Sequence, residues 1–414
     1  MSILKRFLDD DKDLKLIYCI AAIASFIMFL FCPRVNFFDT ATYYQASDLL
    51  LNRGQLDAFR TPLYPLFLAI TVYPVLAYIL QTLIFLFSVR FMYGTMKMLT
   101  SSRRAVILFS LIYVLHPTFL FYNCQLICES LSISLSAIYI YYTVIYLKKG
   151  KTSHCLLIHL TVLLLIFLKP IFIFLLVISF GIFIYNACCR KLTFRHLSAF
   201  IIAFAIQLSI IGGYMSAIHS RYGVFAISNV TDINLYWIMD EHGLIDDSTF
   251  PDDMIKNISG SLDRLKYINN NYGWKELKAI VNENMKLHWK DYLYGYKLTA
   301  TRFLHFSWPF TNISGKNFLK FIAGSIGLSF YQLFVFIGFY LCLTLWSWIK
   351  HRKIPIISLV FFSYTFANCV ILYLTAFNDF SRIIVPSLTV ILVQFLQVSE
   401  CIVSIIRRKP FLMN

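Results

Sequence analysis

One carboxylate near the start of the chain has the type and the placement of a group that does chemistry. Asp39 stands where a helix would begin, since Tyr43 and Ala46 follow it at helical spacing. An aspartate there accepts backbone N–H groups and lies at the positive end of the helix dipole, so it stays ionised at neutral pH. It therefore suits a general base or a cation ligand, with a purely capping role as the alternative. Asp48 falls on nearly the opposite face of that helix and is interpreted as a solvated acid.

Three cations at predicted outer boundaries of the membrane are the next candidates. Arg60, Lys169 and Arg382 lie where positively charged residues are the exception. An arginine fork matches phosphate oxygens, and a lysine supplies a point charge. The set predicts a phosphate site, and the alternative is contact of each side chain with lipid headgroups.

Two further titratable residues are placed inside or beside apolar runs. Glu129 lies near the start of the run 125–147, where an ionised carboxylate is costly, so we expect it to face the protein interior, paired or protonated. Its partner would be Lys169, Arg60 or a substrate hydroxyl, and the alternative is a structural ion pair between helices. His116 precedes a proline and is interpreted as a capping residue rather than a catalyst.

The elements that position these residues must be membrane helices, because composition excludes an ordinary soluble domain. The chain has 414 residues, of which 59% are hydrophobic and 14% charged, and its mean hydropathy is +0.69. The net charge of +16 comes from lysines and arginines clustered in short segments between apolar runs, which is the positive-inside pattern. The charge therefore indicates membrane topology and no nucleic-acid partner.

The fold class predicted is an all-α polytopic membrane protein with about ten transmembrane helices. A span needs about 20 apolar residues, and ten segments qualify or nearly do: 14–33, 72–96, 105–122, 125–147, 154–168, 171–189, 197–218, 321–349, 354–376 and 383–406. Both termini are then expected in the cytoplasm, with every inner connection basic. We divide the chain into an N-terminal transmembrane module (1–218), an outer segment (219–320) and C-terminal transmembrane helices (321–414).

Two outer segments follow from this topology. The first, 34–71, is expected to form two short interfacial helices: one over 40–52, stopped by Gly54, and one capped by Thr61 with Pro62 in its first position. The second, 219–320, carries eleven of the 21 acidic residues. We expect it to be a small helical unit that covers a cavity, since it is too short for a catalytic domain of standard size.

The ten cysteines lie inside or at the ends of apolar runs, and the long outer segment has none. They predict neither a disulfide framework nor a zinc site. Cys124 and Cys128 lie one helical turn apart and are interpreted as small packing residues.

Several motifs together resemble the GT-C superfamily of integral-membrane glycosyltransferases, which use polyprenyl-phosphate sugars. The sequence is most similar to the bacterial branch related to protein mannosyltransferases and aminoarabinose transferases, over roughly residues 14–210 and 350–406. The motifs that carry the resemblance are Phe38-Asp39 followed by Tyr43 and Ala46, Arg60-Thr61-Pro62-Leu63-Tyr64-Pro65-Leu66, Pro117 with Tyr122 and Glu129-Ser130-Leu131, Leu168-Lys169-Pro170, and Ser381-Arg382-Ile383 with Pro386.

The resemblance implies an inner-membrane enzyme with its active site on the periplasmic side. Asp39 would deprotonate an acceptor hydroxyl, which attacks the sugar with inversion, while Arg60, Lys169 and Arg382 hold the donor phosphate. Tyr43, Tyr64, His116 and Glu129 would bind substrate or serve structure. Similarity to phage-type serotype-converting glucosyltransferases suggests a lipopolysaccharide or O-antigen glycan as acceptor, with a donor synthase and a flippase as possible partners.

The family often places a second acid beside the catalytic one, whereas Thr40 follows Asp39 here, which leaves a divalent metal doubtful; no other cofactor is expected. An O-antigen polymerase is an alternative, but it would place paired arginines in two outer loops, and the long outer segment has only the widely spaced Arg221, Arg264 and Arg302. A lipid-linked sugar flippase or secondary transporter is the other alternative; it would need polar sites near the midplane and repeated halves.

Overall fold

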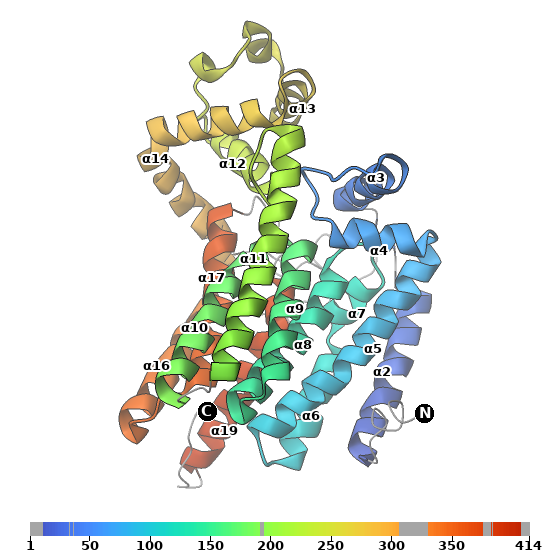
Figure 1. Ribbon diagram of the computed structural model, residues 1–414, viewed down its shortest axis with the longest axis vertical. Helices are drawn as coiled ribbons and strands as arrows, with labels where there is room; N and C mark the ends of the chain where they lie inside the picture. Colours follow the sequence, from blue (N-terminus) through green and yellow to red (C-terminus); the bar gives the residue numbers. More distant parts are fainter. Residues whose placement is uncertain are drawn as a thin grey trace.

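A computed structural model describes residues 11–32, 34–35, 37–190, 194–305, 330–375, 382 and 384–406. This part of the chain is helical and contains no strand. Figure 1 shows a bundle of long helices with a smaller group of helices above one end. The predicted fold class, an all-α polytopic membrane protein, is confirmed.

Seven helices of the described part are long and apolar enough to cross a membrane. They are α2 (Lys12–Phe31), α5 (Pro74–Leu99), α8 (Glu129–Lys149), α10 (Phe174–Arg190) together with the 3₁₀ turn Pro170–Ile173 that precedes it, α11 (Phe194–Tyr222), α16 (Phe330–His351) and α19 (Val385–Ile406). An eighth span is formed if α6 (Arg103–Leu115) and α7 (Pro117–Asn123) count as one, although they are bent by 42° at His116. The bend has a cause, because Pro117 lacks the N–H of an unbroken helix and restricts the residue before it.

The prediction of ten spans therefore exceeds the seven or eight helices that meet the requirements of length and hydropathy. Each of the ten predicted segments still coincides with a helix or the bent pair. The other two segments correspond to α9 (Thr152–Leu168), which has 17 residues, and to α17 (Ile356–Thr375), whose apolar part is Ile356–Leu372. The start of the predicted segment 321–349 lies outside the described residues, and α16 begins at Phe330.

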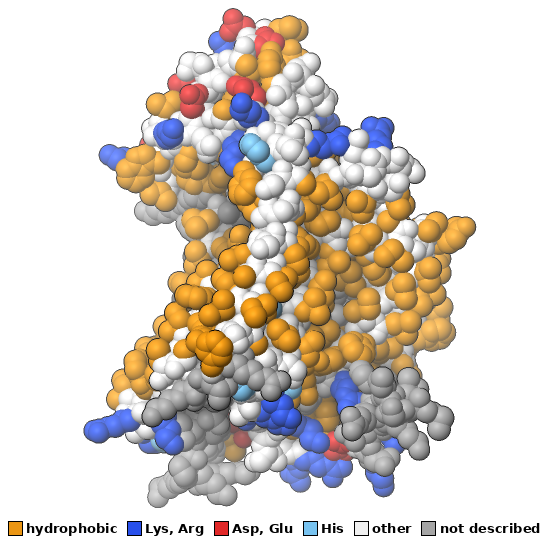
Figure 2. Space-filling model, in the orientation of Figure 1, with side chains coloured by type: hydrophobic (Ala, Val, Ile, Leu, Met, Phe, Trp, Pro, Cys, Tyr) orange, Lys and Arg blue, Asp and Glu red, His pale blue; other side chains and the backbone are white. Residues whose placement is uncertain are grey.

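The two ends of the molecule differ in chain course and in charge. In Figure 1, α2 begins and α19 ends at the lower end, whereas α3 and α12 lie at the upper end. Figure 2 shows a broad apolar band between them, with lysine and arginine side chains at both ends and acidic side chains mainly at the upper end, so that the lower end is the more positive one. This distribution is what a positive-inside protein shows when its lower end faces the cytoplasm.

The helices above the bundle form a small unit with its own core. They are α12 (Val230–Glu241), α13 (Ser261–Asn271) and α14 (Gly273–His305), with two 3₁₀ turns, Asp247–Thr249 and Asp253–Asn257. The apolar face expected on the helix that is now α14 is present, since Leu277, Ile280 and Val281 are buried and Trp274 and Met285 are partly buried. Residues 306–320 of the predicted outer segment lie outside the described part.

Candidate active site

The first outer loop contains the two helices expected, with small differences at their starts. Helix α3 (Phe38–Arg53) begins two residues before the predicted 40–52 and ends at Gly54, whose φ of 60° is the left-handed conformation that glycine adopts readily. Helix α4 (Leu63–Thr71) follows. The prediction that Thr61 caps α4 is wrong, because Pro62 holds the capping position without a side-chain bond and the Thr61 hydroxyl donates instead to the Leu168 carbonyl, 3.0 Å away.

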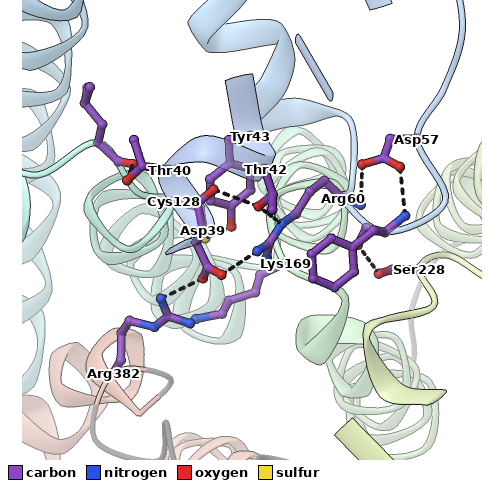
Figure 3. Close-up of polar contacts among 12 residues, drawn as sticks. Asp39, Thr40, Thr42, Tyr43, Asp57, Arg60, Cys128, Lys169, Ser228 and Arg382 are labelled. Atoms are coloured by element: carbon purple, nitrogen blue, oxygen red, sulfur yellow. Dashed lines mark hydrogen bonds and ion pairs between the residues drawn. The ribbon is translucent and has the colours of Figure 1, made fainter. Parts of the chain in front are cut away.

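Asp39 does not cap α3. Phe37 holds the capping position, and Asp39 lies in the first turn, where no side-chain capping bond is made. Both carboxylate oxygens of Asp39 face arginines instead: Oδ1 accepts from Arg60, and Oδ2 lies 2.6 Å from an Arg382 guanidinium nitrogen. Figure 3 shows the two guanidinium groups on opposite sides of the carboxylate. The purely capping role of Asp39 is therefore excluded.

A second carboxylate joins this pair into a network of five charged side chains, which we call the charge network: Asp39, Arg60, Glu129, Lys169 and Arg382. Glu129 is 1% exposed, and its Oε1 lies 2.9 Å from Lys169 Nζ and 3.4 Å from Arg382 Nε. The predicted inward orientation of Glu129 is confirmed; of the three partners left open by the sequence, Lys169 contacts it, and Arg382 is a further partner that was not expected. Because Arg382 contacts both acids, residues from four distant parts of the sequence converge at one place.

Arg60 is held in the network by several groups. Its Nε donates to the Thr42 hydroxyl over 2.7 Å, and its backbone N–H donates to the Asp57 carboxylate over 3.2 Å. Its guanidinium carbon lies 4.6 Å from the ring centre of Tyr43 and 4.2 Å from that of Phe59, within the range of cation–π contact. The orientation of this arginine is therefore fixed before any ligand arrives.

The loop that carries Arg60 is fastened to the chain that enters the outer unit. The Asn229 N–H donates to the Ala58 carbonyl over 2.9 Å, and the Ser228 hydroxyl donates to the Phe59 carbonyl over 2.6 Å. At the end of α11, the Tyr222 hydroxyl donates to the Leu56 carbonyl over 2.8 Å. These bonds set the distance between the charge network and α12.

The electrostatics of the site favour an anionic ligand. Burial by itself raises the pKa of Asp39, but Arg382 and Arg60 outweigh it, so the pKa lies below its usual value and the group stays ionised. Asp57 differs, because burial raises the pKa of its carboxyl above the usual value despite three backbone N–H groups. With three cations and two carboxylates, the charge network carries one net positive charge.

A cavity of about 540 Å³ opens beside the charge network. Asp39, Arg60, Lys169 and Arg382 lie in its wall. The other lining residues are aliphatic or aromatic for the most part, with hydroxyl and amide groups from the start of α12: Phe37, Phe38, Tyr43, Phe59, Thr61, Leu168, Pro170, Ile171, Ile173, Ser228, Val230, Thr231, Asn234, Trp237 and Ile371. A volume of this size is typical of small-molecule sites.

The remaining candidates divide into those near the cavity and those away from it. Tyr43 lines the cavity, and its hydroxyl donates to Cys128 Sγ over 3.0 Å. Tyr64 packs edge-on against Tyr43 and donates to Gln81 over 2.8 Å, so it supports the wall without lining it. His116 lies at the α6–α7 bend with its ring stacked on Phe119, and it does not line this cavity.

Two features of the site could not be read from the sequence. Cys128 donates to Glu129 over 3.6 Å and so links Tyr43 to the charge network, but a buried cysteine in an apolar run gives no signal of this role. The contribution of α12 has a weak signal. Three of its cavity residues recur every three positions: Thr231, Asn234 and Trp237. That spacing shows a shared helix face but not what the face meets.

The residues of the site do not fit a divalent metal. Among the described residues, no group of three or more His, Cys, Asp or Glu side chains is placed to hold one. The two carboxylates at the cavity are each paired with cations, and three positive side chains would repel a further cation. Asp48, on the same helix as Asp39, is exposed and accepts a bond from Asn52, as expected for a solvated acid.

Comparison with known proteins gives a result for structure alone. No family model matches this sequence, and no curated protein matches it either. The archaeal oligosaccharyltransferase AglB from Archaeoglobus fulgidus, solved with an inhibitory peptide and a dolichol-phosphate, is similar with a TM-score of 0.50 and 12% identity, over 96% of this chain and 52% of that one. The Archaeoglobus fulgidus oligosaccharyltransferase in its apo form matches with a TM-score of 0.49 and 10% identity, over 99% of this chain and 53% of that one. The chain thus spans about half the length of these structures.

Proposed function

We propose that this chain, which shares the GT-C glycosyltransferase fold with AglB, transfers a sugar from a polyprenyl-phosphate donor to a hydroxyl group of a glycan. The acceptor would be a lipid-linked or lipopolysaccharide glycan such as O-antigen, at the periplasmic face of the inner membrane. Both termini would lie in the cytoplasm. A donor synthase and a flippase would supply the lipid-linked sugar at that face.

The observation that carries this proposal is the charge network at the wall of the cavity. Transfer from a lipid phosphate needs a base for the acceptor proton and cations for the leaving phosphate. Asp39 supplies an ionised carboxylate, and Arg60, Lys169 and Arg382 supply cations within the same group of contacts. The dolichol-phosphate bound by AglB is a lipid phosphate of this chemical class.

The lining of the cavity contains groups that suit both substrates. Ile171, Ile173 and Ile371 are aliphatic, which suits the isoprenoid chain of the donor. Asn234 and Trp237 of α12 are polar and aromatic, which suits a sugar ring because the ring has hydroxyl groups at its edge and C–H groups on its faces. The donor would thus enter from the membrane and the acceptor from the side of the outer unit.

The reaction would be a single displacement with inversion at the anomeric carbon. The acceptor oxygen forms a bond to that carbon while the bond from the carbon to the phosphate oxygen breaks. The acceptor proton moves to Asp39, and the electron pair of the broken bond stays on the phosphate, next to the three cations. The arginines orient the phosphate through paired N–H groups, which a lysine cannot do.

Asp39 is a weak base while two arginines contact it, because they lower its pKa. A phosphate that enters the cavity competes for the same N–H groups. Each N–H that turns from Asp39 to the phosphate removes a contact that favours the ionised carboxylate, so the pKa of Asp39 rises. The base would therefore become strong enough only when the donor is in place.

The test is sugar transfer from a polyprenyl-phosphate donor in membranes that carry wild type, Asp39→Asn or Asp48→Asn at matched expression. Loss of a general base costs about 10²–10⁴-fold in rate. We therefore expect Asp39→Asn to lose transfer and Asp48→Asn, an exposed acid on the same helix, to keep it. Normal transfer by Asp39→Asn would reject Asp39 as the base. Absence of transfer by wild type with every donor and acceptor, together with movement of the lipid-linked sugar across the membrane, would favour a transporter.

A further inference from the structure

Two cysteines far apart in the sequence meet at the upper end of the bundle. Cys32 ends α2, and Cys124 ends α7, 92 positions later. Their side chains hydrogen-bond to each other, and both residues are buried, with 5% and 2% exposure. The structure holds both as thiols.

The surroundings fix this pair. The amide of Gln125, the residue after Cys124, donates to Cys32 Sγ over 3.6 Å. The oxygen of the same amide accepts from the Val35 N–H over 2.8 Å. The segment that follows Cys32 is therefore bonded to the residue that follows Cys124. Gln81 in turn donates to the Gln125 carbonyl over 2.9 Å. The two thiols therefore lie in a contact that several independent hydrogen bonds maintain.

Cys128 is the other cysteine near this place, and it has different partners. Its sulfur accepts from Tyr43 and donates to Glu129. Cys124 and Cys128 lie one helical turn apart in the sequence. The contacts instead pair Cys124 with Cys32.

We propose that Cys32 and Cys124 form a disulfide bond in the mature protein. The upper end of the bundle carries the outer loops in the proposed orientation, and a compartment outside the cytoplasm is where such bonds form and persist. The bond would join the segment that leads into α3, and hence Asp39, to the segment that leads into α8, and hence Glu129. It would be a structural bond that holds the two carboxylates of the charge network in register.

The chemistry is an exchange of two electrons. The two thiols lose two protons and two electrons, one S–S bond forms, and the oxidised disulfide of a thiol oxidoreductase of that compartment is reduced to a dithiol. Because both sulfurs are buried in the folded chain, the exchange must take place while the outer ends of α2 and α7 come together. Once formed, the bond would be shielded from thiol reductants.

The first test is peptide mapping of the full chain, extracted from its membrane and denatured in sodium dodecyl sulfate with N-ethylmaleimide and without reductant, so that buried thiols are labelled as well. We expect a linked pair of peptides that contain Cys32 and Cys124, and N-ethylmaleimide on the exposed Cys19, Cys188 and Cys189. N-ethylmaleimide on both Cys32 and Cys124 would overturn the proposal, and so would a link between Cys124 and Cys128.

The second test is thermal unfolding with and without dithiothreitol. The reductant should lower the midpoint of wild type and of Cys19→Ser, whose cysteine is exposed on α2, but not that of the double variant Cys32→Ser/Cys124→Ser. If dithiothreitol is present while wild type unfolds and the midpoint does not change, the structural role of the disulfide is overturned. An epitope tag at the C-terminus, read in inside-out vesicles, reports the orientation separately. Free thiols in a correctly oriented protein would reject the bond and leave the proposed transfer reaction untouched.

Discussion

At the scale of single residues, the properties of Asp39 are set by side chains that the sequence does not place near it. Its spacing before α3 predicted an ionised acid, and that prediction holds, but for another reason than the one given. The helix cap is Phe37, and the ionised state comes from Arg60 and Arg382. The ionised state of Asp39 could be predicted from the sequence, whereas its partners depend on tertiary packing across more than three hundred positions.

The lowered pKa of Asp39 gives a pH dependence for activity. Since Arg382 and Arg60 hold this pKa below the value of about 3.9 for a free aspartate, the base stays ionised down to acidic pH. We expect the acid limb of kcat/KM to fall below about pH 4, because this parameter reports the free enzyme. In Arg382→Gln one of the two cations is gone, so the limb should move to higher pH. A limb at the same pH in both proteins would show that another group titrates.

The ion pairs of Asp39 stabilise the fold in the same direction. Because its pKa is lower in the folded chain than in the unfolded chain, their contribution is present above about pH 4 and is lost as the pH falls through the folded value. Lowering the pH through this range would therefore weaken the contact between Asp39 of α3 and Arg382.

The pair of Glu129 and Lys169 gives a prediction for stability. In Glu129→Gln, Lys169 and Arg382 keep their buried charges without this carboxylate, and breaking a buried pair in this way costs about 3–5 kcal/mol. Adding Lys169→Met should recover part of the loss, since one uncompensated charge is removed. Thermal unfolding in detergent measures both. Asp253→Asn, which breaks an exposed pair with Lys256, is the control and should leave the midpoint unchanged. An unchanged midpoint in Glu129→Gln would contradict the network.

At the scale of elements, helices with strong local signals were predictable and contacts between elements were not. Helix α3 was placed to within two residues at its start because apolar spacing and Gly54 define it locally. The start of α4 was misread because Thr61 bonds to Leu168, a residue distant in sequence, in place of its own helix. The approach of α12 to the loop of Arg60 likewise depends on bonds such as that between Ser228 and Phe59.

The side of the cavity formed by α12 predicts an effect on the acceptor. Trp237 lines the cavity, whereas Trp289 of α14 is exposed. Trp237→Ala should raise the KM for the acceptor about tenfold, equivalent to roughly 1.4 kcal/mol. It should leave the KM for the donor unchanged, because in the proposed reaction the donor phosphate binds to the charge network. Trp289→Ala should change neither value. An equal rise of the KM for both substrates in Trp237→Ala would contradict a specific role of Trp237 in acceptor binding.

At the scale of the whole molecule, fold class and the polarity of the two ends followed from composition. The count of ten spans stays a prediction: seven helices of the described part, or eight with the bent pair α6 and α7, have the length and hydropathy of a span, and α9 has 17 residues. Hydropathy reports how apolar a segment is, and the path of the segment depends on the helices around it.

The proposed orientation can be measured with single cysteines. Lys149, at the lower end of α8, and Asp263, in the outer unit, are exposed. An impermeant maleimide applied to intact cells should label Asp263→Cys above the level of wild type and should label Lys149→Cys only after the cells are opened. The opposite pattern would invert the topology and place the charge network in the cytoplasm.

The ratio of three cations to two carboxylates in the charge network has a consequence for product release. A polyprenyl-phosphate sugar is a phosphodiester with one negative charge, so its complex with the network is electroneutral. After transfer, Asp39 carries the acceptor proton and the network holds two positive charges, while the freed phosphate monoester carries close to two negative charges at neutral pH. The product complex is again electroneutral as long as the proton stays. Loss of that proton to water leaves an excess negative charge in the cavity, so deprotonation of Asp39 would expel the spent lipid carrier and reset the base in the same event.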